Sequence, residues 1–234
     1  MSVGRVLLWR HGRTAANASG RLQGQIDIPL DEVGRWQART AAATLLARYD
    51  PSVIVSSDLS RARATAEYLA RGTGLKVTED PEVRERSFGV WEGLTGEEID
   101  ERWPDEFAVW RAGGDPFGFE AESRADVSAR LGAAIRRHAA ALTPADTLVV
   151  VSHGAAIALA VGALLGQPAS WRGVIGLHNA HWAELVPSRG GAAPDWRLTG
   201  LNLGPTDAST DWNAGPDVAP EEADEDRDPA RDPD

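Results

Sequence analysis

The chain alternates short, continuous apolar runs with longer segments in which apolar residues recur at helical spacing. The runs at 3–9, 52–55 and 147–151 are dominated by Val, Ile and Leu, which is typical of strands buried on both faces of a sheet. A weaker run at 75–78 predicts one more strand in the first half of the chain. Three later runs predict the strands that close the sheet, at 174–177, 181–187 and 196–201.

Four segments between these runs predict helices, at 31–49, 60–71, 123–142 and 155–165. Asp31 is expected to cap the first helix, either Asp58 or Ser60 the second, and Ser123 the third. Two of the helices carry apolar residues that can share a buried side: Val33, Trp36, Leu45 and Leu46 in the first, and Val127, Leu131, Ile135 and Leu142 in the third.

In residues 81–122 the apolar residues follow no sustained helical or strand spacing. This predicts an irregular segment with two short helical pieces, at 96–103 and 105–111. Aromatic side chains crowd this part of the chain: Trp91, Trp103, Trp110, Phe117 and Phe119. Two interpretations stay open. The rings can form a satellite core under a long loop, line a pocket that selects part of a ligand, or do both, because the inner face of such a loop lines whatever lies beneath it.

The alternation of strands and helices predicts an α/β fold, a three-layer α/β/α sandwich with a mainly parallel sheet. No segment repeats elsewhere in the chain. We expect one domain over residues 1–204, because 234 residues with 42% hydrophobic content suffice for a single full core. Residues 205–234 are rich in Pro, Asp and Glu and nearly lack large apolar residues, so we expect an acidic disordered tail.

The formal net charge of −11 is unevenly distributed along the chain. Residues 205–234 hold 11 acidic residues and two Arg, a net charge of −9, so that residues 1–204 carry only −2. Neither part has the basic footprint of a nucleic-acid-binding protein, and no nucleic-acid partner is expected. An acidic tail of this kind could instead dock a partner protein.

The chain contains no Cys, which excludes disulfides, thiolate metal sites and a cysteine nucleophile and agrees with a reducing compartment. No apolar stretch is long enough to span a bilayer. The N-terminal residues enter the first predicted strand at once, without the small-residue cleavage site of a signal peptide. We therefore expect a cytoplasmic protein with no membrane partner.

Two histidines, each followed by glycine, stand where predicted strands end. His11 follows the run at 3–9, and His153 follows the run at 147–151 directly before a predicted helix. The carboxyl ends of parallel strands meet at the edge of a sheet where α/β proteins place ligands, so the two rings are expected to lie together. The free N–H groups at the start of the second helix would add an anion site between them.

Two arginines add positive charge to the same edge of the sheet. Arg10 directly precedes His11, and Arg61 lies in the first turn of the helix that follows the strand at 52–55. The helix dipole disfavours a cation in a first turn, so an anion nearby would explain the position of Arg61. Guanidinium groups bind phosphate through paired hydrogen bonds, and the combination predicts a phosphate site.

A phosphate site that contains a histidine admits nucleophilic chemistry, because neutral imidazole attacks phosphorus and its product is labile. Arginines can neutralise the transferring group without a metal. A carboxyl group must then protonate the leaving oxygen and later accept a proton from water. Glu85 is the candidate, while Glu79 and Glu92 are more typical of solvated carboxylates. No His, Asp or Glu cluster has metal-ligand spacing, so we expect no metal and no cofactor.

Four motifs occur in order along the chain: RHG at 10–12, SSDLSRARAT at 56–65, RERSFGVWEGLT at 84–95 and VVVSHG at 149–154. Together they resemble the histidine phosphatase superfamily, in its phosphoglycerate mutase-like branch, over about residues 5–200. The resemblance implies the phosphoglycerate mutase-like fold, with His11 as the phosphohistidine nucleophile and Glu85 as the proton donor and acceptor.

The resemblance also implies binding roles, a small phosphorylated metabolite as substrate, and a homodimer. Three residues are expected to clamp the phosphoryl group and four to assist them or touch the substrate: Arg10, Arg61 and His153, and then Asn17, Gln23, Gly24 and Gly154.

Within the superfamily, the motifs are most similar to those of the glucosyl-3-phosphoglycerate phosphatases. The 68 positions from Glu85 to His153 leave no room for the longer insertion of glycolytic mutases. A metal-independent phosphomonoesterase acting on a sugar or glycerate phosphate is therefore the leading hypothesis. A phosphoglycerate mutase using the same site is the alternative, and an inactive phosphate-binding or docking module is a third hypothesis from another class.

Two departures from the family pattern remain. Arg13 stands where relatives usually have Glu or Gln, and it either adds a charge near the phosphate for a second substrate anion or points outward. Residues 120–123 read EAES where related phosphatases commonly place two glycines, which leaves the path of this loop over the pocket open.

Overall fold

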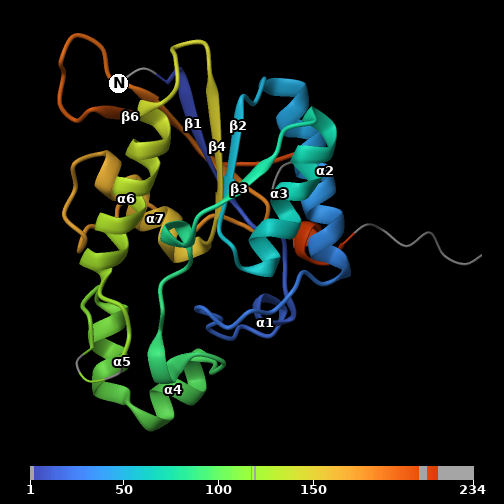
Figure 1. The fold of residues 1–234 in the computed structure, drawn as a ribbon. Coiled ribbons are helices and arrows are strands. Elements are labelled where there is room, and N and C mark those ends of the chain that lie inside the picture. Colours follow the sequence, from blue (N-terminus) through green and yellow to red (C-terminus); the bar gives the residue numbers. More distant parts are fainter. Residues whose placement is uncertain (1–2, 117, 119, 206–209, 216–234) are drawn as a thin grey trace, which may run out of the picture.

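The sheet runs through the middle of the molecule in the order β3-β2-β4-β1-β5-β6 (Figure 1). The structure is a computed structural model that describes residues 3–116, 118, 120–205 and 210–215. The strands are β1 (Arg5–Arg10), β2 (Val53–Ser56), β3 (Val77–Glu79), β4 (Thr147–Ser152), β5 (Trp182–Pro187) and β6 (Trp196–Leu203). Strands β1 to β4 pair in parallel, whereas β5 runs antiparallel to both of its neighbours. The expected mainly parallel sheet is confirmed.

Helices cover both faces of this sheet, α2 and α3 on one face and α6 and α7 on the other (Figure 1). The predicted three-layer α/β/α sandwich is therefore confirmed. The α-helices are α1 (Ala15–Ala18), α2 (Glu32–Arg48), α3 (Ser60–Thr73), α4 (Gly96–Arg102), α5 (Pro104–Arg111), α6 (Arg124–Ala140) and α7 (Gly154–Leu164). Short 3₁₀ turns lie at Pro81–Val83, Gly89–Trp91 and Thr210–Asn213.

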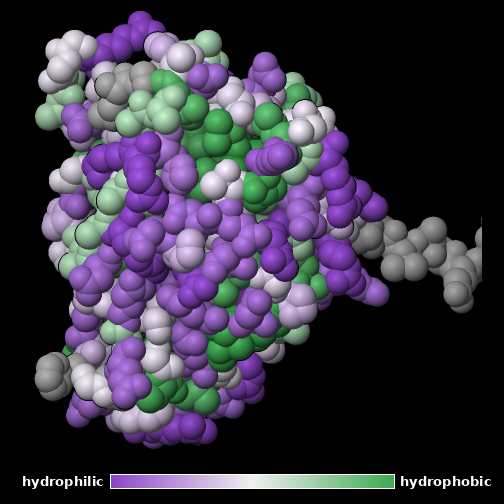
Figure 2. All heavy atoms as spheres, viewed as in Figure 1, coloured by the Kyte–Doolittle hydropathy of each residue, from purple (hydrophilic) through white to green (hydrophobic). Residues whose placement is uncertain are grey.

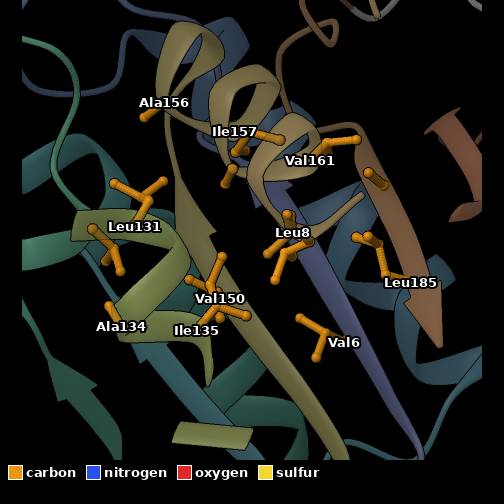
Figure 3. Packing of buried hydrophobic residues seen from close by; sticks show 14 of the residues in the cluster. Val6, Leu8, Leu131, Ala134, Ile135, Val150, Ala156, Ile157, Val161 and Leu185 are labelled. Carbon is orange, nitrogen blue, oxygen red and sulfur yellow. The ribbon is translucent and has the colours of Figure 1, made fainter. Parts of the chain in front are cut away.

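Alternate side chains of β1 enter two separate cores, because successive residues of a strand point to opposite faces. Leu8 packs with Val150 of β4 against α6 and α7, as Figure 3 shows. Leu7 and Trp9 pack on the opposite face against α2 and α3. Strands that are buried on both faces must be apolar almost throughout, which is why these central strands are continuous apolar runs in the sequence.

The buried face of α2 consists mostly of small residues. Asp31 caps α2, and its Oδ1 accepts a hydrogen bond from the Gly34 N–H at 2.7 Å. Leu45 is buried, but Leu46 is 36% exposed, so its expected place on the buried face was wrong. Leu46 lies one residue further around the helix and packs beside Gly72 of α3.

Two other local expectations also fail, and each for a tertiary reason. Neither Asp58 nor Ser60 caps α3 with its side chain, because Asp58 pairs with Arg84 and the Ser60 N–H donates to Asp27 at 2.8 Å. The run at 174–177 forms no strand. The Leu177 carbonyl at the end of this run accepts instead from the Arg10 guanidinium.

Residues 88–110 form a small core of their own beside the main sheet. Phe88, Trp91 and Phe107 are buried in it, and Trp103 and Trp110 pack against them. Trp91 meets Trp110 edge to face at 6.2 Å between ring centroids. The described aromatics therefore form a satellite core, and Trp110 also lines the cavity described below, while Phe117 and Phe119 lie outside the described residues.

A short C-terminal segment packs onto the domain. Trp212 is 4% exposed, lies against the ring of Trp36 at 4.9 Å between centroids, and donates from Nε1 to the Asn179 carbonyl at 2.8 Å. The expected acidic tail from residue 205 onward therefore includes a segment, 210–215, that one aromatic ring docks onto the domain. Residues 206–209 and 216–234 lie outside the described residues.

The surface is mainly polar on the face that Figure 2 shows, and hydrophobic residues appear there in limited groups. In the part of the chain that the structure describes, no helix combines the length and the hydropathy needed to cross a bilayer.

Candidate active site

His11 and His153 lie side by side at one edge of the sheet. Arg10 at the end of β1 stands opposite Ser152 at the end of β4, so the next residue of each strand is adjacent to its counterpart. The two ring centroids are 5.1 Å apart, with the planes inclined by 59°. The juxtaposition expected from the two strand ends is present in the structure.

The ring of His11 is oriented by its own neighbour in sequence. Nδ1 lies 2.6 Å from the Gly12 carbonyl oxygen, which can only accept a hydrogen bond. Nδ1 therefore carries the proton of the neutral ring, and Nε2 keeps its lone pair. Burial, together with the charges of Arg61 and Arg10, holds the pKa of His11 well below its ordinary value. The arrangement provides a neutral imidazole with a free nucleophilic nitrogen.

His153 has the opposite arrangement of ring nitrogens. Its Nδ1 accepts a hydrogen bond from Nε of Arg61 at 3.2 Å, which leaves the proton of the neutral ring on Nε2. Burial and the charge of Arg61 hold the pKa of His153 well below its ordinary value. Nε2 is buried and has no hydrogen-bond partner among the described residues, so it is a donor that a bound oxygen would satisfy.

Arg61 is held in place by backbone carbonyls instead of a carboxylate. Its guanidinium donates to the carbonyls of Gly24 at 2.7 Å and Ile26 at 2.8 Å. Only 1% of the residue is exposed, and burial lowers its pKa to about 10, so it stays charged at neutral pH. Within the described residues Arg61 forms no ion pair, and a buried unpaired cation is costly unless an anion binds beside it.

Arg10 supplies a second cation at the same place. Its guanidinium donates to the Leu177 carbonyl, and its Nε is buried without a hydrogen-bond partner in the described part of the chain. A Cβ on Gly154 would lie 3.4 Å from Nε and Cζ of Arg10. The glycine therefore keeps the first turn of α7 close to this guanidinium.

Glu85 is fastened to the start of α7. Its Oε1 accepts from the Ala156 and Arg86 N–H groups, both at 2.8 Å, and its Oε2 accepts from the Ala155 N–H at 3.1 Å. The positive end of the helix dipole favours a carboxylate there. This contact brings a residue from the irregular segment to the two histidines, a position that the sequence pattern alone does not specify.

The three expected residues of the loop after β1 are near the cavity but make structural contacts. The Asn17 Oδ1 accepts from Thr14 and from Asn179 at 3.1 Å, which leaves its Nδ2 to donate to a ligand. The Gln23 amide is engaged, because its Oε1 accepts from the Thr14 hydroxyl at 2.8 Å and its Nε2 donates to a carbonyl of the loop at 3.3 Å. Gly24 supplies the carbonyl that holds Arg61.

A cavity of about 560 Å³ opens above these groups, and every expected site residue except His153 contributes to its wall. His153 is fully buried beneath it and contacts His11 and Arg61. Apolar and aromatic side chains form another part of the wall: Phe88, Trp110, Leu159, Trp171 and Ile175. A cavity with polar groups at one place and rings elsewhere fits a small ligand that carries a phosphate and a bulkier portion.

The two family departures now have a structural account. Arg13 does not line the cavity, since its Nε donates to Asp31 at 2.8 Å and its guanidinium also contacts the Asn213 carbonyl. It points outward and ties the C-terminal segment to α2. Glu122 in the EAES stretch binds Arg130 through both carboxylate oxygens, at 2.6 and 2.8 Å, and Ser123 caps α6.

Sequence reasoning missed residues that act through the backbone. Asn179 donates from Nδ2 to the His11 carbonyl at 3.2 Å. Arg130 donates to the carbonyls of Glu82 and Arg84, each at 2.8 Å, and of Glu85 at 2.9 Å, so that it holds the segment carrying the candidate acid. An isolated arginine in a helix has no signal in sequence for such a role. The other three histidines, His138, His178 and His181, lie outside the cavity wall; His138, for example, lies 2.8 Å from Asp80.

Comparison with known proteins assigns the family. The model of the family described as "Histidine phosphatase superfamily (branch 1)" matches residues 6–202 of this chain. The chain belongs to the histidine phosphatase superfamily. Histidine phosphatases are phosphoric monoester hydrolases that act through a phosphohistidine, and the paired imidazoles agree with that chemistry.

Relatives with assigned names are similar over most of the chain. A glucosyl-3-phosphoglycerate phosphatase of Mycobacterium tuberculosis is 40% identical over 210 residues, which cover 85% of this chain and 94% of the relative. The enzyme of the same name from Mycolicibacterium vanbaalenii is 40% identical over 80% of this chain and 85% of its own length. The "Probable phosphoglycerate mutase GpmB" of Photorhabdus laumondii is 36% identical over 77% and 83%.

Solved structures show the same fold. A mycobacterial glucosyl-3-phosphoglycerate phosphatase in complex with VO3 superposes with a TM-score of 0.77 at 40% identity, covering 86% of this chain and all of that one. A phosphoserine phosphatase from Entamoeba histolytica gives 0.71 at 28% identity over 85% and 96%. The expected phosphoglycerate mutase-like fold is thus confirmed.

Proposed function

We propose that the chain is a metal-independent phosphomonoesterase whose nucleophile is Nε2 of His11. The observation that carries this proposal is the complementary state of the two neighbouring rings. His11 presents a lone pair because Gly12 accepts from its Nδ1, and His153 presents an N–H because Arg61 donates to its Nδ1. A phosphoryl group between them would be attacked by one ring and bound by the other.

In the first step, Nε2 of His11 attacks phosphorus, the P–N bond forms, and the P–O bond to the leaving group breaks. Glu85 in its protonated form gives its proton to the leaving oxygen. Arg10, Arg61 and the Nε2–H of His153 neutralise the charge on the phosphoryl oxygens. The Nδ2 of Asn17 and the Gly154 N–H assist at the same oxygens.

In the second step, the Glu85 carboxylate takes a proton from water, and the oxygen of that water attacks phosphorus. The P–N bond breaks, inorganic phosphate leaves, and His11 and Glu85 return to their starting states. The role of Glu85 needs a fixed carboxyl group, and the three N–H groups that bind it supply that rigidity.

The substrate we propose is a small sugar or glycerate phosphate, with glucosyl-3-phosphoglycerate as the first compound to test. Support comes from two sides. Relatives at 40% identity carry that name, and the cavity wall offers rings such as Trp110 and Trp171 against which a sugar can pack. Gln23 and Gly24 line the same cavity, and we propose that they contact the portion of the substrate next to the phosphate.

The test is phosphate release from a panel of phosphomonoesters in EDTA, together with trapping of labelled phosphate on the protein. Wild type is expected to release phosphate and to carry label, and His11→Ala is expected to do neither. Label on the His11→Ala variant would disprove the nucleophile. The His178→Ala variant, which changes an exposed ring outside the cavity, is the matched control.

A phosphoglycerate mutase remains the second candidate because the GpmB relatives carry that name. Isomerisation of 3-phosphoglycerate that depends on a bisphosphorylated primer, without release of phosphate, would favour it. An inactive docking module is the third candidate, and turnover of any ester by the intact chain would contradict it. A cytoplasmic location and a homodimer stay predictions; light scattering on the purified chain tests the second.

A further inference from the structure

The cavity wall carries more positive charge than a phosphate site needs. Besides Arg10 and Arg61, four arginines contribute to it, and Glu85 is the one acidic residue among the described residues of the wall. The four are Arg21, Arg86, Arg124 and Arg172. A phosphoryl dianion next to the histidines would balance Arg10 and Arg61, which leaves the charges of the other four arginines.

Two of these four arginines have carboxylate partners. Arg21 binds Glu98 through two nitrogens, at 2.7 and 3.2 Å. Arg86 binds Asp115 at 2.7 Å and is buried to 98% of its side chain. Their charges are therefore compensated within the protein, and neither calls for a ligand.

Arg124 has no such partner in the described part of the chain. Its one side-chain hydrogen bond runs from Nε to the Ala169 carbonyl at 3.4 Å, and its backbone N–H takes the second oxygen of Asp115 at 3.0 Å. It is the first residue of α6, where the helix dipole disfavours a cation. The Arg124, Arg86 and Arg172 side chains all line the same cavity. Burial, together with the charges of Arg86 and Arg172, lowers the pKa of Arg124.

Arg172 is the second unpaired cation of the group. NH1 donates to the carbonyls of Trp110 and Arg111, at 3.5 and 2.7 Å, so the end of α5 holds the side chain in place. Its Nε and NH2 have no hydrogen-bond partner among the described residues, and it forms no ion pair there. Among the described residues, Asp115 binds the guanidinium of Arg86 and the backbone N–H of Arg124, so the guanidinium groups of Arg124 and Arg172 have no carboxylate partner.

We propose that Arg124 and Arg172 bind a second anionic group of the substrate, a carboxylate on the portion that leaves with the ester oxygen. This proposal rests on the phosphatase function proposed above and names the two residues that would select, among its candidate substrates, the phosphate esters whose alcohol carries an acid. Guanidinium groups with free N–H donors match the planar oxygens of a carboxylate. The same pair would bind the alcohol's carboxylate while Arg10 and Arg61 hold the phosphoryl group.

The elements that position the pair support a separate subsite. Arg124 and Arg172 come from the start of α6 and from the segment after α7, whereas the phosphoryl site is built from the ends of β1 and β4. Trp110 and Trp171 lie in the wall beside the pair. An ester that spans both groups of arginines has its neutral portion against these rings.

The experiment compares specificity constants for 3-phosphoglycerate and for glycerol 2-phosphate, which lacks the acid, in wild type, Arg124→Gln and Arg172→Gln. One lost charge-assisted hydrogen bond corresponds to about a 10- to 100-fold effect, so each variant should lower the ratio of kcat/KM for the two esters by that factor. The loss should appear mainly in KM, because the carboxylate binds equally before and during the reaction. Arg71→Gln, an exposed arginine outside the cavity, is the matched control.

A second experiment measures the affinity for phosphonates, which bind without being hydrolysed. Calorimetry with a carboxyalkyl phosphonate and an alkyl phosphonate of equal length should give a preference for the first in wild type, and the preference should vanish in the double variant Arg124→Gln/Arg172→Gln. The proposal would be overturned if kcat/KM for both esters fell by the same factor in the arginine variants. It would also be overturned if wild type bound the two phosphonates equally well. A preference for a bisphosphonate over the carboxylate would also overturn it.

The two proposals fail in different ways. If wild type releases no phosphate from any ester, the phosphatase proposal fails while the phosphonate titration still tests the anion subsite. If phosphate is released but the ratio of specificity constants is the same in all variants, the phosphatase stands and the anion subsite is wrong.

Discussion

Nε of Arg61 donates to Nδ1 of His153 at 3.2 Å, while the same guanidinium donates to two carbonyls of the loop after β1. This contact decides which nitrogen of His153 carries the proton, and it leaves Nε2–H directed away from the arginine. The relationship joins α3, β4 and the loop after β1 in one site. Arg61 therefore acts both as a cation and as the group that sets the state of its neighbour.

Replacement of Arg61 by lysine should reduce activity strongly although it keeps the charge. Lysine has a single nitrogen and cannot bind the carbonyls of Gly24 and Ile26 and the His153 ring together. Loss of one preorganised donor to a developing charge typically costs about 10²- to 10³-fold in kcat, and we expect that range for Arg61→Lys. Steady-state kinetics check it, with the exposed Arg63→Lys as the control. Equal rates in the two variants would contradict the assigned role.

Acid should destabilise the protein through the two site histidines. Their pKa values are lowered in the folded state, so the unfolded chain binds more protons below its ordinary histidine pKa of about 6.5. The contribution is complete above that pH and is lost as the pH falls toward the lowered values, by at most about 1.4 kcal/mol per pH unit for each ring.

Urea unfolding of wild type and of His11→Gln/His153→Gln at pH 7.5 and pH 5.5 measures this effect. The free energy of unfolding of wild type should fall more between the two pH values than that of the double variant. Parallel changes would show that other groups carry the acid sensitivity.

Replacement of Glu85 by glutamine should separate esters by their leaving groups. Glutamine cannot give a proton, so kcat/KM for an alkyl phosphate should fall by about 10²- to 10⁴-fold. The leaving group of p-nitrophenyl phosphate, p-nitrophenolate, is a stable anion that needs no proton, so kcat/KM for this ester should fall much less. An equal loss for both esters would indicate that Glu85 mainly fastens the start of α7 through its contacts with Ala155 and Ala156.

Removal of the Trp212 ring should lower stability and disturb the site indirectly. The ring is buried against Trp36, and its N–H satisfies the Asn179 carbonyl. Truncation of a buried tryptophan to alanine typically costs about 3–5 kcal/mol, and we expect Trp212→Ala near the lower end of that range. Val90→Ala, at a residue that is 50% exposed, should change the free energy of unfolding by less than about 0.5 kcal/mol.

Much of the fold could be predicted because local patterns and tertiary demands agree. The central strands are buried on both faces, so their apolar runs are continuous and easily recognised. Asp31 and Ser123 cap helices as expected, since a cap is satisfied within one turn. His11 and His153 could be brought together from the sequence because each ends a parallel strand, and parallel strands end at a common edge.

Features that depend on which distant segments meet were decided only by the tertiary structure. Nothing local indicates that Arg13 binds Asp31 away from the cavity, that one ring docks residues 210–215, or that the Leu177 carbonyl accepts from the Arg10 guanidinium. The same holds for the unpaired charges of Arg124 and Arg172, which stand 48 positions apart in the chain. Hydrophobic periodicity and capping operate within a few residues, whereas ion pairs and edge pairing depend on the assembled fold.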